Sequence, residues 1–326
     1  MPEVAVEELR SRAVARLVLE GVRQDHAEVV VDHMLTADLW GRTSHGLSVR
    51  FEYTLHQAEA GAGRTAPELV LDQGHLAVVS GHNGFGYLAG HFATRLLIER
   101  AREHAITAVA LKAARHTGML GYYVDMAARA GVVAMAFGHC CPLMAPAGGS
   151  RRLLGTNPVA FGFPAEPDPI VVDMATSAIS YGDVLERQRA GEPLPAGCAL
   201  DSEGNPTRDP AAALEGALLP FGGHRGGALA VAIQLLAGAL AGAAPVPPAG
   251  QDYGLLLVGF SRGAFAGAES YDAAVRAFTE AYLSVPPLPG QEVRLPGARR
   301  YRNWRERSAG CIAISDKLAA VLGLSG

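Results

Sequence analysis

The interleaving of short apolar runs with segments of helical periodicity constrains the fold of this chain most. Four runs have the length and composition of buried strands, and they read "ITAVALKA", "GVVAMAFG", "PVAFGFPA" and "PIVVDMATS". Helical patterns lie between or after them, at 87–103, 119–130, 180–190, 225–241 and 270–283. Strands that alternate with helices indicate an α/β fold.

The first forty residues favour helices over strands. Apolar residues recur at spacings of three and four in "VEELRSRAVARLVLEGV" and "AEVVVDHMLTADLWG", which predicts two amphipathic helices. Residues 64–81 then alternate apolar and polar side chains around Asp72-Gln73-Gly74, a pattern typical of a β-hairpin. The sequence therefore predicts a helical N-terminal part followed by a region of strands and helices.

Composition and charge argue against a disordered protein and against a nucleic-acid-binding protein. With 326 residues, of which 49% are hydrophobic and 18% charged, the chain can bury a large core and is not of disordered composition. Its formal net charge of −4 gives no field that attracts nucleic acid. Lysine and arginine are scattered except in "RRYRNWRER" near the end, so we expect no nucleic-acid partner.

The cysteines indicate a reducing compartment. They stand at positions 140, 141, 198 and 311, with no CxxC pair and no zinc-ligand spacing, so we expect neither a metal nor a disulfide framework. Cys140 and Cys141 have no evident activating partner in the sequence, and we interpret them as buried small residues. The opening residues lack a basic stretch followed by an apolar one, which predicts no signal peptide and a cytoplasmic location.

One apolar segment, residues 226–245, is nearly long enough to span a bilayer, and Gln234 is its only polar side chain. Its glycines and alanines make it only weakly hydrophobic, and no second such segment accompanies it. A core or interface helix explains it as well. We therefore expect no membrane association.

Gly84, Gly86 and Ala89 have the G-x-G-x-x-A spacing of a dinucleotide-binding turn between a strand-like run and a helix. The acidic residue that should bind the ribose is missing, because the next strand ends in Lys112 and Arg115. Glycines that merely turn a chain into a helix are more common. We favour that interpretation over a Rossmann site.

His45, in "TSHG", could transfer a proton because its ordinary pKa lies near neutrality. It could equally be a polar residue at a helix end, with Ser44 as a cap. Asp183 begins a helix-like stretch, where it is either a first-turn acid or a carboxylate that orients a histidine. From these residues alone, both interpretations remain open.

Two further groups could contact a nucleotide. His224 and Arg225 lie among glycines in "FGGHRGG", before a long helix, where a phosphate or nicotinamide contact and a solvated loop are both plausible. Asp173 ends the run "PIVVD" and could stop a strand or hydrogen-bond a ribose.

Taken in order, seven blocks resemble the malate/L-lactate/L-sulfolactate dehydrogenase family, a non-Rossmann group of NAD(P)-dependent oxidoreductases. They are "DLWGRTSHG", "HTGMLGYYVDMAARAG", "APAGGSRRLLGTNPVAFGFP", "VVDMATS", "GEPLPAGCALDSEGNPTRDP", "LLPFGGHRGGALAVAIQLLAGAL" and "RLPGARR". The resemblance implies an α/β fold like that of L-sulfolactate dehydrogenase, in which an N-terminal helical segment joins a non-Rossmann nucleotide-binding domain with a mixed sheet. We expect residues 1–63, joined by 305–326, to form part of a substrate domain, and 64–304 to bind the nucleotide and form a homodimer.

"YGDV" and "GGHRGG" look most like the Δ1-piperideine-2-carboxylate and Δ1-pyrroline-2-carboxylate reductase branch, since dehydrogenases acting on malate or lactate tend to carry Lys where Asp183 stands. The resemblance assigns proton delivery to Ser44, His45 and Asp183. It assigns substrate contacts to Arg50, Thr156, Tyr181 and Gly182, although the family usually places its carboxylate-binding arginine at the position of Val49. It assigns the nucleotide to His116, Thr117, Gly118, Met119, Leu120, Asp173, Met174, Ala175, His224, Arg225, Arg294, Pro296, Gly297, Arg299 and Arg300.

The implied activity is NAD(P)H-dependent reduction of a cyclic imino acid to the L-amino acid, with a small carboxylate as substrate. The alternatives are a 2-hydroxy acid dehydrogenase and an inactive homologue that only binds the nucleotide. Arg299 or Arg300 could bind a 2′-phosphate through two hydrogen bonds, which favours NADPH over NADH.

Overall fold

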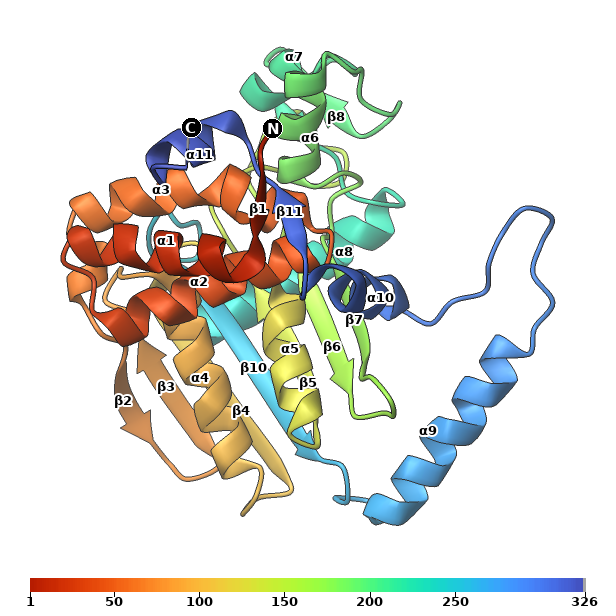
Figure 1. Ribbon diagram of the computed structural model, residues 1–326. Coiled ribbons are helices and arrows are strands. Elements are labelled where there is room, and N and C mark those ends of the chain that lie inside the picture. Colours follow the sequence, from red (N-terminus) through yellow and green to blue (C-terminus); the bar gives the residue numbers. More distant parts are fainter. Residues whose placement is uncertain (325–326) are drawn as a thin grey trace.

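A seven-stranded mixed sheet forms the centre of the computed structural model, which describes residues 1–324 (Figure 1). The strands lie in the order β2-β3-β4-β10-β5-β6-β7, and only β3 and β4 are parallel neighbours. Their bounds are β2 Glu68–Asp72, β3 Leu76–Ser80, β4 Ile106–Ala114, β5 Val132–Gly138, β6 Val159–Phe163, β7 Ile170–Met174 and β10 Tyr253–Ser261. The expected α/β class and mixed sheet are confirmed.

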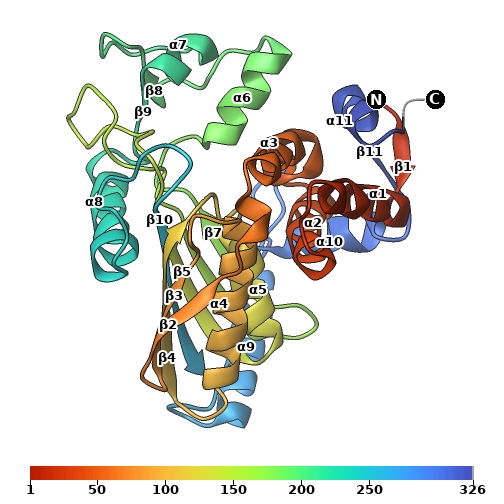
Figure 2. The same cartoon turned by 90° about the vertical axis from the view of Figure 1, so that its left-hand side faces the viewer.

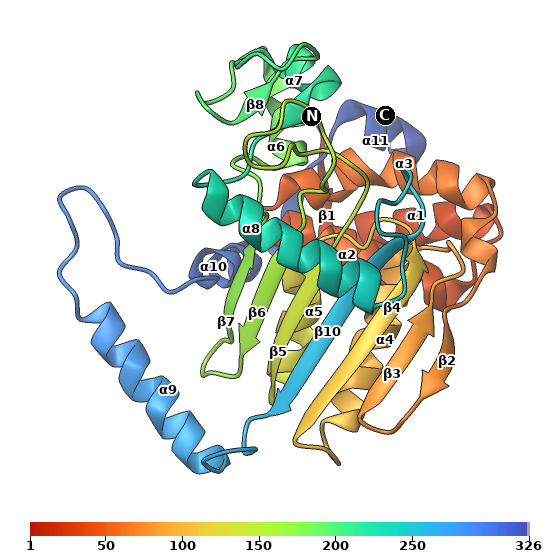
Figure 3. The same cartoon turned by 180° about the vertical axis from the view of Figure 1, so that it is seen from behind.

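Helices cover the two faces of this sheet unequally. α4 (Gly86–Arg100) and α5 (Leu120–Arg129) pack on one face and complete a core of alanine, valine and leucine side chains (Figure 2). α8 (His224–Ile233), continued by a π-helical turn η3 (Gln234–Leu240), crosses part of the other face (Figure 3). This helix is the apolar segment discussed above, and no helix within residues 1–324 is long and apolar enough to cross a membrane.

The N-terminal helices build a second core with the end of the chain. α1 (Val6–Leu19), α2 (Gln24–Leu39) and α3 (Leu47–Glu59) share it with Ile312, Leu318 and their neighbours. β1 (Glu3–Ala5) pairs antiparallel with β11 (Cys311–Ala313), and α11 (Asp316–Val321) lies beside α3 (Figure 1). The predicted helices are confirmed, whereas the division of the chain at residue 63 stays a prediction.

A small lobe with its own apolar cluster lies beyond one end of the sheet (Figure 1). It contains α6 (Tyr181–Ala190), α7 (Pro210–Glu215) and the short pair β8 (Ala199–Leu200) and β9 (Ala217–Leu218). The remaining helices are α9 (Ala268–Leu283), α10 (Ala298–Arg307), and the 3₁₀ turns η1 (Thr43–His45) and η2 (Ala62–Arg64).

The central strand of the sheet, β10, was not predicted from the sequence. β10 reads "YGLLLVGFS", a short apolar run of the same kind as the four strand runs identified from the sequence, and both of its faces are largely buried. It pairs with β4 and β5, two strands that are distant from it in the sequence.

The glycine-rich turn before α4 serves close packing. A Cβ on Gly86 would lie 2.3 Å from the carbonyl oxygen of Arg115 and 2.4 Å from that of His116. Gly86 therefore lets the start of α4 touch the segment after β4, in agreement with the non-Rossmann interpretation.

Candidate active site

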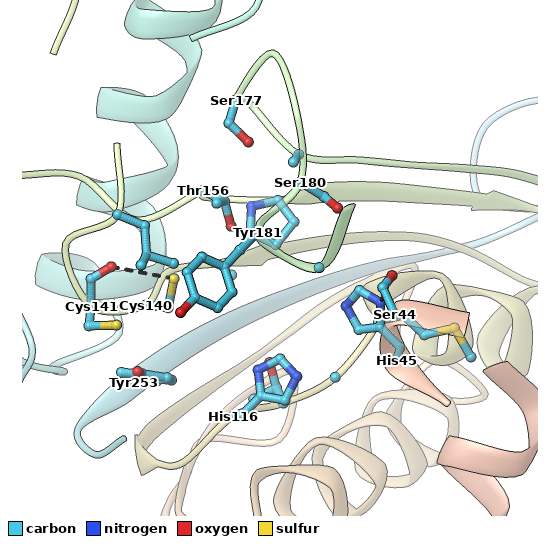
Figure 4. A pocket seen from close by; sticks show the side chains of 18 of the residues that line it. Ser44, His45, His116, Cys140, Cys141, Thr156, Ser177, Ser180, Tyr181 and Tyr253 are labelled. Carbon is cyan, nitrogen blue, oxygen red and sulfur yellow. Dashed lines mark hydrogen bonds between the residues drawn. The ribbon is translucent and has the colours of Figure 1, made fainter. Parts of the chain in front are cut away.

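A cavity of about 1180 Å³ opens between the N-terminal helices, one end of the sheet and the small lobe (Figure 4). Its lining comes from segments that are far apart in the sequence. Among the predicted site residues it includes Ser44, His45, Arg50, His116, Thr117, Gly118, Met119, Leu120, Thr156, Asp173, Met174, Ala175, Tyr181, Gly182 and Asp183. All the predicted catalytic and substrate-binding residues thus lie in one cavity with most of the predicted nucleotide-binding residues.

Ser44 and His45 lie in the 3₁₀ turn η1 between α2 and α3. The Ser44 hydroxyl lies 3.2 Å from Nδ1 of His45, within hydrogen-bonding distance. Behind the turn, Oδ2 of Asp38 accepts a 2.8 Å hydrogen bond from the backbone N–H of Leu47, at the start of α3. A Cβ on Gly46 would lie 1.7 Å from the Asp38 carboxylate, so glycine is required there.

The surroundings of His45 keep its imidazole neutral. Burial lowers the pKa of His45 to about 3, and the positive charges of Arg50 and Arg42 contribute in the same direction. The His45 and His116 rings are stacked with centroids 6.0 Å apart (Figure 4). With Nδ1 next to Ser44, Nε2 is the ring nitrogen left for a bound molecule.

Arg50 reaches the cavity although it stands one position later than the family's usual arginine. Its Nε donates a 2.9 Å hydrogen bond to the carbonyl oxygen of Ser44, and its side chain lines the wall together with Val49 and Tyr53. Arg42 lines the same cavity. Two guanidinium groups close to His45 suit an anionic substrate.

The predicted Ser44–His45–Asp183 set is only partly assembled. Asp183 is exposed at the rim of the cavity, in the first turn of α6, where its backbone N–H is capped by Ser180 Oγ at 3.0 Å. The one side-chain hydrogen bond found for His45 within residues 1–324 is that with Ser44. Gly182, next to Asp183, packs directly on Ser44, because a Cβ there would lie 2.3 Å from the Ser44 Cβ.

A buried histidine that the sequence analysis missed supports the segment 116–120. Nε2 of His33, on α2, accepts a 3.0 Å hydrogen bond from the backbone N–H of Met119. A Cβ on Gly118 would lie 2.2 Å from the same nitrogen, so the backbone and the ring are in close contact. Burial lowers the pKa of His33 well below its ordinary value, which keeps the ring a neutral acceptor. Within a helical apolar pattern, nothing marked His33 as special.

Asp173 and Arg300 flank the N-terminus of α5. Oδ2 of Asp173 accepts a 2.9 Å hydrogen bond from the backbone N–H of Gly121, and burial raises the pKa of this carboxyl group. The Arg300 guanidinium lies 4.6 Å above the Trp40 ring. Its Nη1 atom is buried and has no hydrogen-bond partner within the described part of the chain.

The other predicted nucleotide contacts lie outside the main cavity in this chain. His224 borders a second cavity of about 480 Å³, which shares Ala178 with the first, and Arg225 is exposed. Arg294, Pro296, Gly297, Arg299 and Arg300 line neither of the two cavities.

The proline-rich stretch 246–250 also lines the cavity, because Asn83 and Arg115 tie the chain around it to the sheet. One interpretation made from the sequence needs correction. Cys140 and Cys141, interpreted as buried, are half-buried in the cavity wall (Figure 4). Among the described residues, no group of histidine, cysteine and acidic side chains could hold a metal ion.

A neutral histidine and nearby arginines in a cavity on a mixed sheet are the groups that proton transfer to a small anion requires. The family model for malate/L-lactate dehydrogenases matches residues 4–323, and the chain belongs to that family. It is an NAD(P)-dependent oxidoreductase.

Three relatives illustrate the range of the family. The chain is 36% identical to a (2R)-3-sulfolactate dehydrogenase (NADP(+)) from Chromohalobacter salexigens, covering 97% of each chain. It is 35% identical to a Δ1-pyrroline-2-carboxylate/Δ1-piperideine-2-carboxylate reductase from Pseudomonas aeruginosa, covering 95% of this chain and 94% of the relative. The solved sulfolactate dehydrogenase of Methanocaldococcus jannaschii superimposes with a TM-score of 0.90 at 32% identity, covering 98% and 95% of the two chains. Overall identity therefore does not select the substrate.

Proposed function

We propose that this enzyme reduces a cyclic imino acid of the Δ1-pyrroline-2-carboxylate or Δ1-piperideine-2-carboxylate type to the L-amino acid. The observation that carries the proposal is the exposed carboxylate of Asp183 at the rim of the cavity that Ser44 and His45 also line, next to Gly182, which packs on Ser44. A carboxylate attracts the protonated imine nitrogen of such a substrate and repels the second anionic group of malate or sulfolactate. The resemblance to the imine-reducing branch supports the same conclusion.

In this proposal, Arg50 and Arg42 bind the substrate carboxylate. The bound carboxylate offsets the positive charge that, with burial, lowers the pKa of His45. The pKa of His45 then moves up toward its ordinary value, so that the imidazole can carry the proton that the imine nitrogen receives. Ser44 holds Nδ1 and orients the ring, while Asp183 stabilises the cationic nitrogen.

The cavity also fits a nicotinamide cofactor, which supplies the hydride when bound. It is large enough for an extended ligand, and Nε2 of His116 is buried without a hydrogen-bond partner among the described residues. Residues 116–120 and 173–175 would hold the cofactor beside His45. We favour NADPH, because Arg300 has an unpartnered buried nitrogen near this wall, and we expect NADPH to bind more tightly than NADH in fluorescence titrations.

The test of the proposed activity is NADPH oxidation, followed by absorbance. The two cyclic imino acids are compared with pyruvate, oxaloacetate and sulfopyruvate under identical conditions. We expect kcat/KM to be highest for a cyclic imino acid. A higher value for an oxo acid would support the alternative, a 2-hydroxy acid dehydrogenase, which the additional cavity arginines Arg152 and Arg189 favour.

His45→Ala separates proton transfer from nucleotide binding. We expect this variant to lose at least about a hundred-fold in kcat, in line with the usual contribution of a general acid. NADPH affinity should stay within several-fold, because residues 116–120 and 173–175 remain in place. A fully active variant would contradict the proton-transfer role.

We also propose that the enzyme is a homodimer. α9 projects from the body, and none of its residues is buried (Figure 3). Its apolar side chains are among those exposed, since Phe278 and Leu283 are 58% and 50% exposed. Such an amphipathic helix is suited to covering the open part of the sheet face of a second copy. Light scattering should give twice the mass of one chain, and Phe278→Glu should shift the protein toward monomer. A monomeric wild-type protein would contradict this proposal.

A further inference from the structure

Two adjacent thiols that the proposed reaction does not use lie in the cavity wall. Cys140 and Cys141 follow β5 after one intervening residue, His139, and neither is part of a disulfide (Figure 4). The Cys140 thiol is turned back toward the carbonyl oxygen of Cys141 at 3.6 Å. It also fits tightly against Gly155, where a Cβ would lie 2.8 Å from the sulfur.

Cys141 is surrounded by groups that favour its thiolate. The side chains of Cys140 and Tyr253 and the positive charge of Arg152 lower the pKa of the Cys141 thiol, against the opposing effect of burial. The pKa of Cys140 shifts in the opposite direction, because the neighbouring Cys141 thiol and burial both disfavour a thiolate there. The two neighbours are therefore chemically unequal.

We propose that Cys141 is a thiol-modification site, at which a low-molecular-weight disulfide such as glutathione disulfide forms a mixed disulfide and blocks the cavity. Arg152 suits this ligand class, because its guanidinium can pair with the carboxylates of such a peptide disulfide. Together, the partial exposure of Cys141 within a cavity, the adjacent thiol donor and the neighbouring arginine distinguish this site from the other cysteines.

The reagent disulfide is itself the oxidant in the exchange step, so no further reagent is needed. The Cys141 thiolate attacks one sulfur of the reagent, a new Cys141 S–S bond forms and the S–S bond of the reagent breaks. Cys141 is oxidised, and the departing half is reduced and leaves as a thiolate that takes a proton from water. Cys140 stays a thiol, so the product is one mixed disulfide and not a disulfide between neighbours. Added reductant reverses the reaction.

Blockage follows from the position of the thiol. Cys141 lines the same cavity as His45 and Thr156, so a peptide-sized adduct occupies volume that substrate or cofactor needs. Inhibition thus depends on this cavity being the active site, whereas the modification itself does not.

The test uses Cys311→Ser enzyme, which removes the exposed cysteine of β11, outside the cavity. The protein is incubated with glutathione disulfide at pH 6.5, with and without NADPH, and the modified peptides are identified by mass spectrometry over time. Cys141 should react about ten-fold faster than Cys140 and Cys198, with one adduct per chain, and NADPH should slow the reaction several-fold. Cys141→Ser in the same background serves as the control and should take up adduct only at the slower rate of Cys140 and Cys198.

Preferential reaction of Cys140 or Cys198, or a disulfide between Cys140 and Cys141, would overturn the proposed site. Stoichiometric modification of Cys141 with unchanged NADPH binding and turnover would overturn the proposed blockage. Peptide mapping measures modification without a known substrate. A negative result for the modification site is therefore distinguishable from a negative result for the proposed activity.

Discussion

The contact between Gly182 and Ser44 makes the most specific structural prediction. In Gly182→Ala, the new Cβ would lie 2.3 Å from the Ser44 Cβ and 3.0 Å from its Oγ. Since carbon atoms pack at about 3.8 Å, α6 and the Ser44–His45 turn must separate by about 1.5 Å. A displacement of about 1 Å at a reacting group can cost about a hundred-fold in rate. We therefore expect kcat to fall by about that factor.

Nucleotide binding and stability should change much less in Gly182→Ala. Overpacking lowers the free energy of unfolding by about 1–3 kcal/mol, and replacing a helical glycine by alanine raises it by up to about 1 kcal/mol. The assay compares kcat, NADPH affinity and Tm with those of Gly310→Ala, a control whose Cβ meets only the Arg307 carbonyl at an ordinary 3.8 Å. A Gly182→Ala enzyme with wild-type kcat would show that the packing contact between α6 and Ser44 is not needed for turnover.

Three further predictions concern charge. Arg50→Ala should raise KM for the carboxylate substrate at least about ten-fold, because it removes a charged hydrogen-bond donor; unchanged KM and kcat would exclude Arg50 from substrate binding. Asp38 has a pKa raised by burial to about 7, so the stability gained by protonating it in the folded state is lost as the pH rises through 7. Asp38→Asn keeps an acceptor for Leu47 without a charge. Its free energy of unfolding relative to wild type, from urea titrations, should therefore increase between pH 5 and pH 8, and a constant difference would refute this. The depressed pKa values of His33, His45 and His116 have the opposite effect on stability: they lower the free energy of unfolding as the pH falls. The reason is that the unfolded chain takes up protons below about pH 6.5 while these three side chains in the folded chain do not. Each should lower the wild-type free energy of unfolding by up to about 1.4 kcal/mol per pH unit below that point, and equal stability at pH 7 and pH 5 would contradict it.

Much of the fold could be predicted from local pattern. The N-terminal helices, the hairpin at 68–80 and the helices along the chain have clear periodicity or turn residues. The place of β10 between β4 and β5 could not be predicted in the same way, because it depends on pairing with strands distant in the sequence.

The residues of the site were predictable mainly through the resemblance, whereas their contacts were not. The resemblance predicted Ser44, His45 and Asp183 as one proton-delivery set. Of the side-chain hydrogen bonds that such a set needs, only the Ser44–His45 bond is formed within the described residues. The supporting role of His33 depends on a tertiary contact with Met119, which no local pattern encodes. Buried polar partners of this kind need coordinates.

The central claim is that this enzyme transfers hydride from NADPH to a C=N bond. Its most direct test is internal competition, with Δ1-pyrroline-2-carboxylate and pyruvate at equal concentration and NADPH deuterated at the transferred position of C4. The ratio of deuterated proline to deuterated lactate, measured by NMR, gives the ratio of the two kcat/KM values. We predict L-proline labelled at its α-carbon in clear excess. Excess labelled lactate, or no deuterium in proline, would contradict the account.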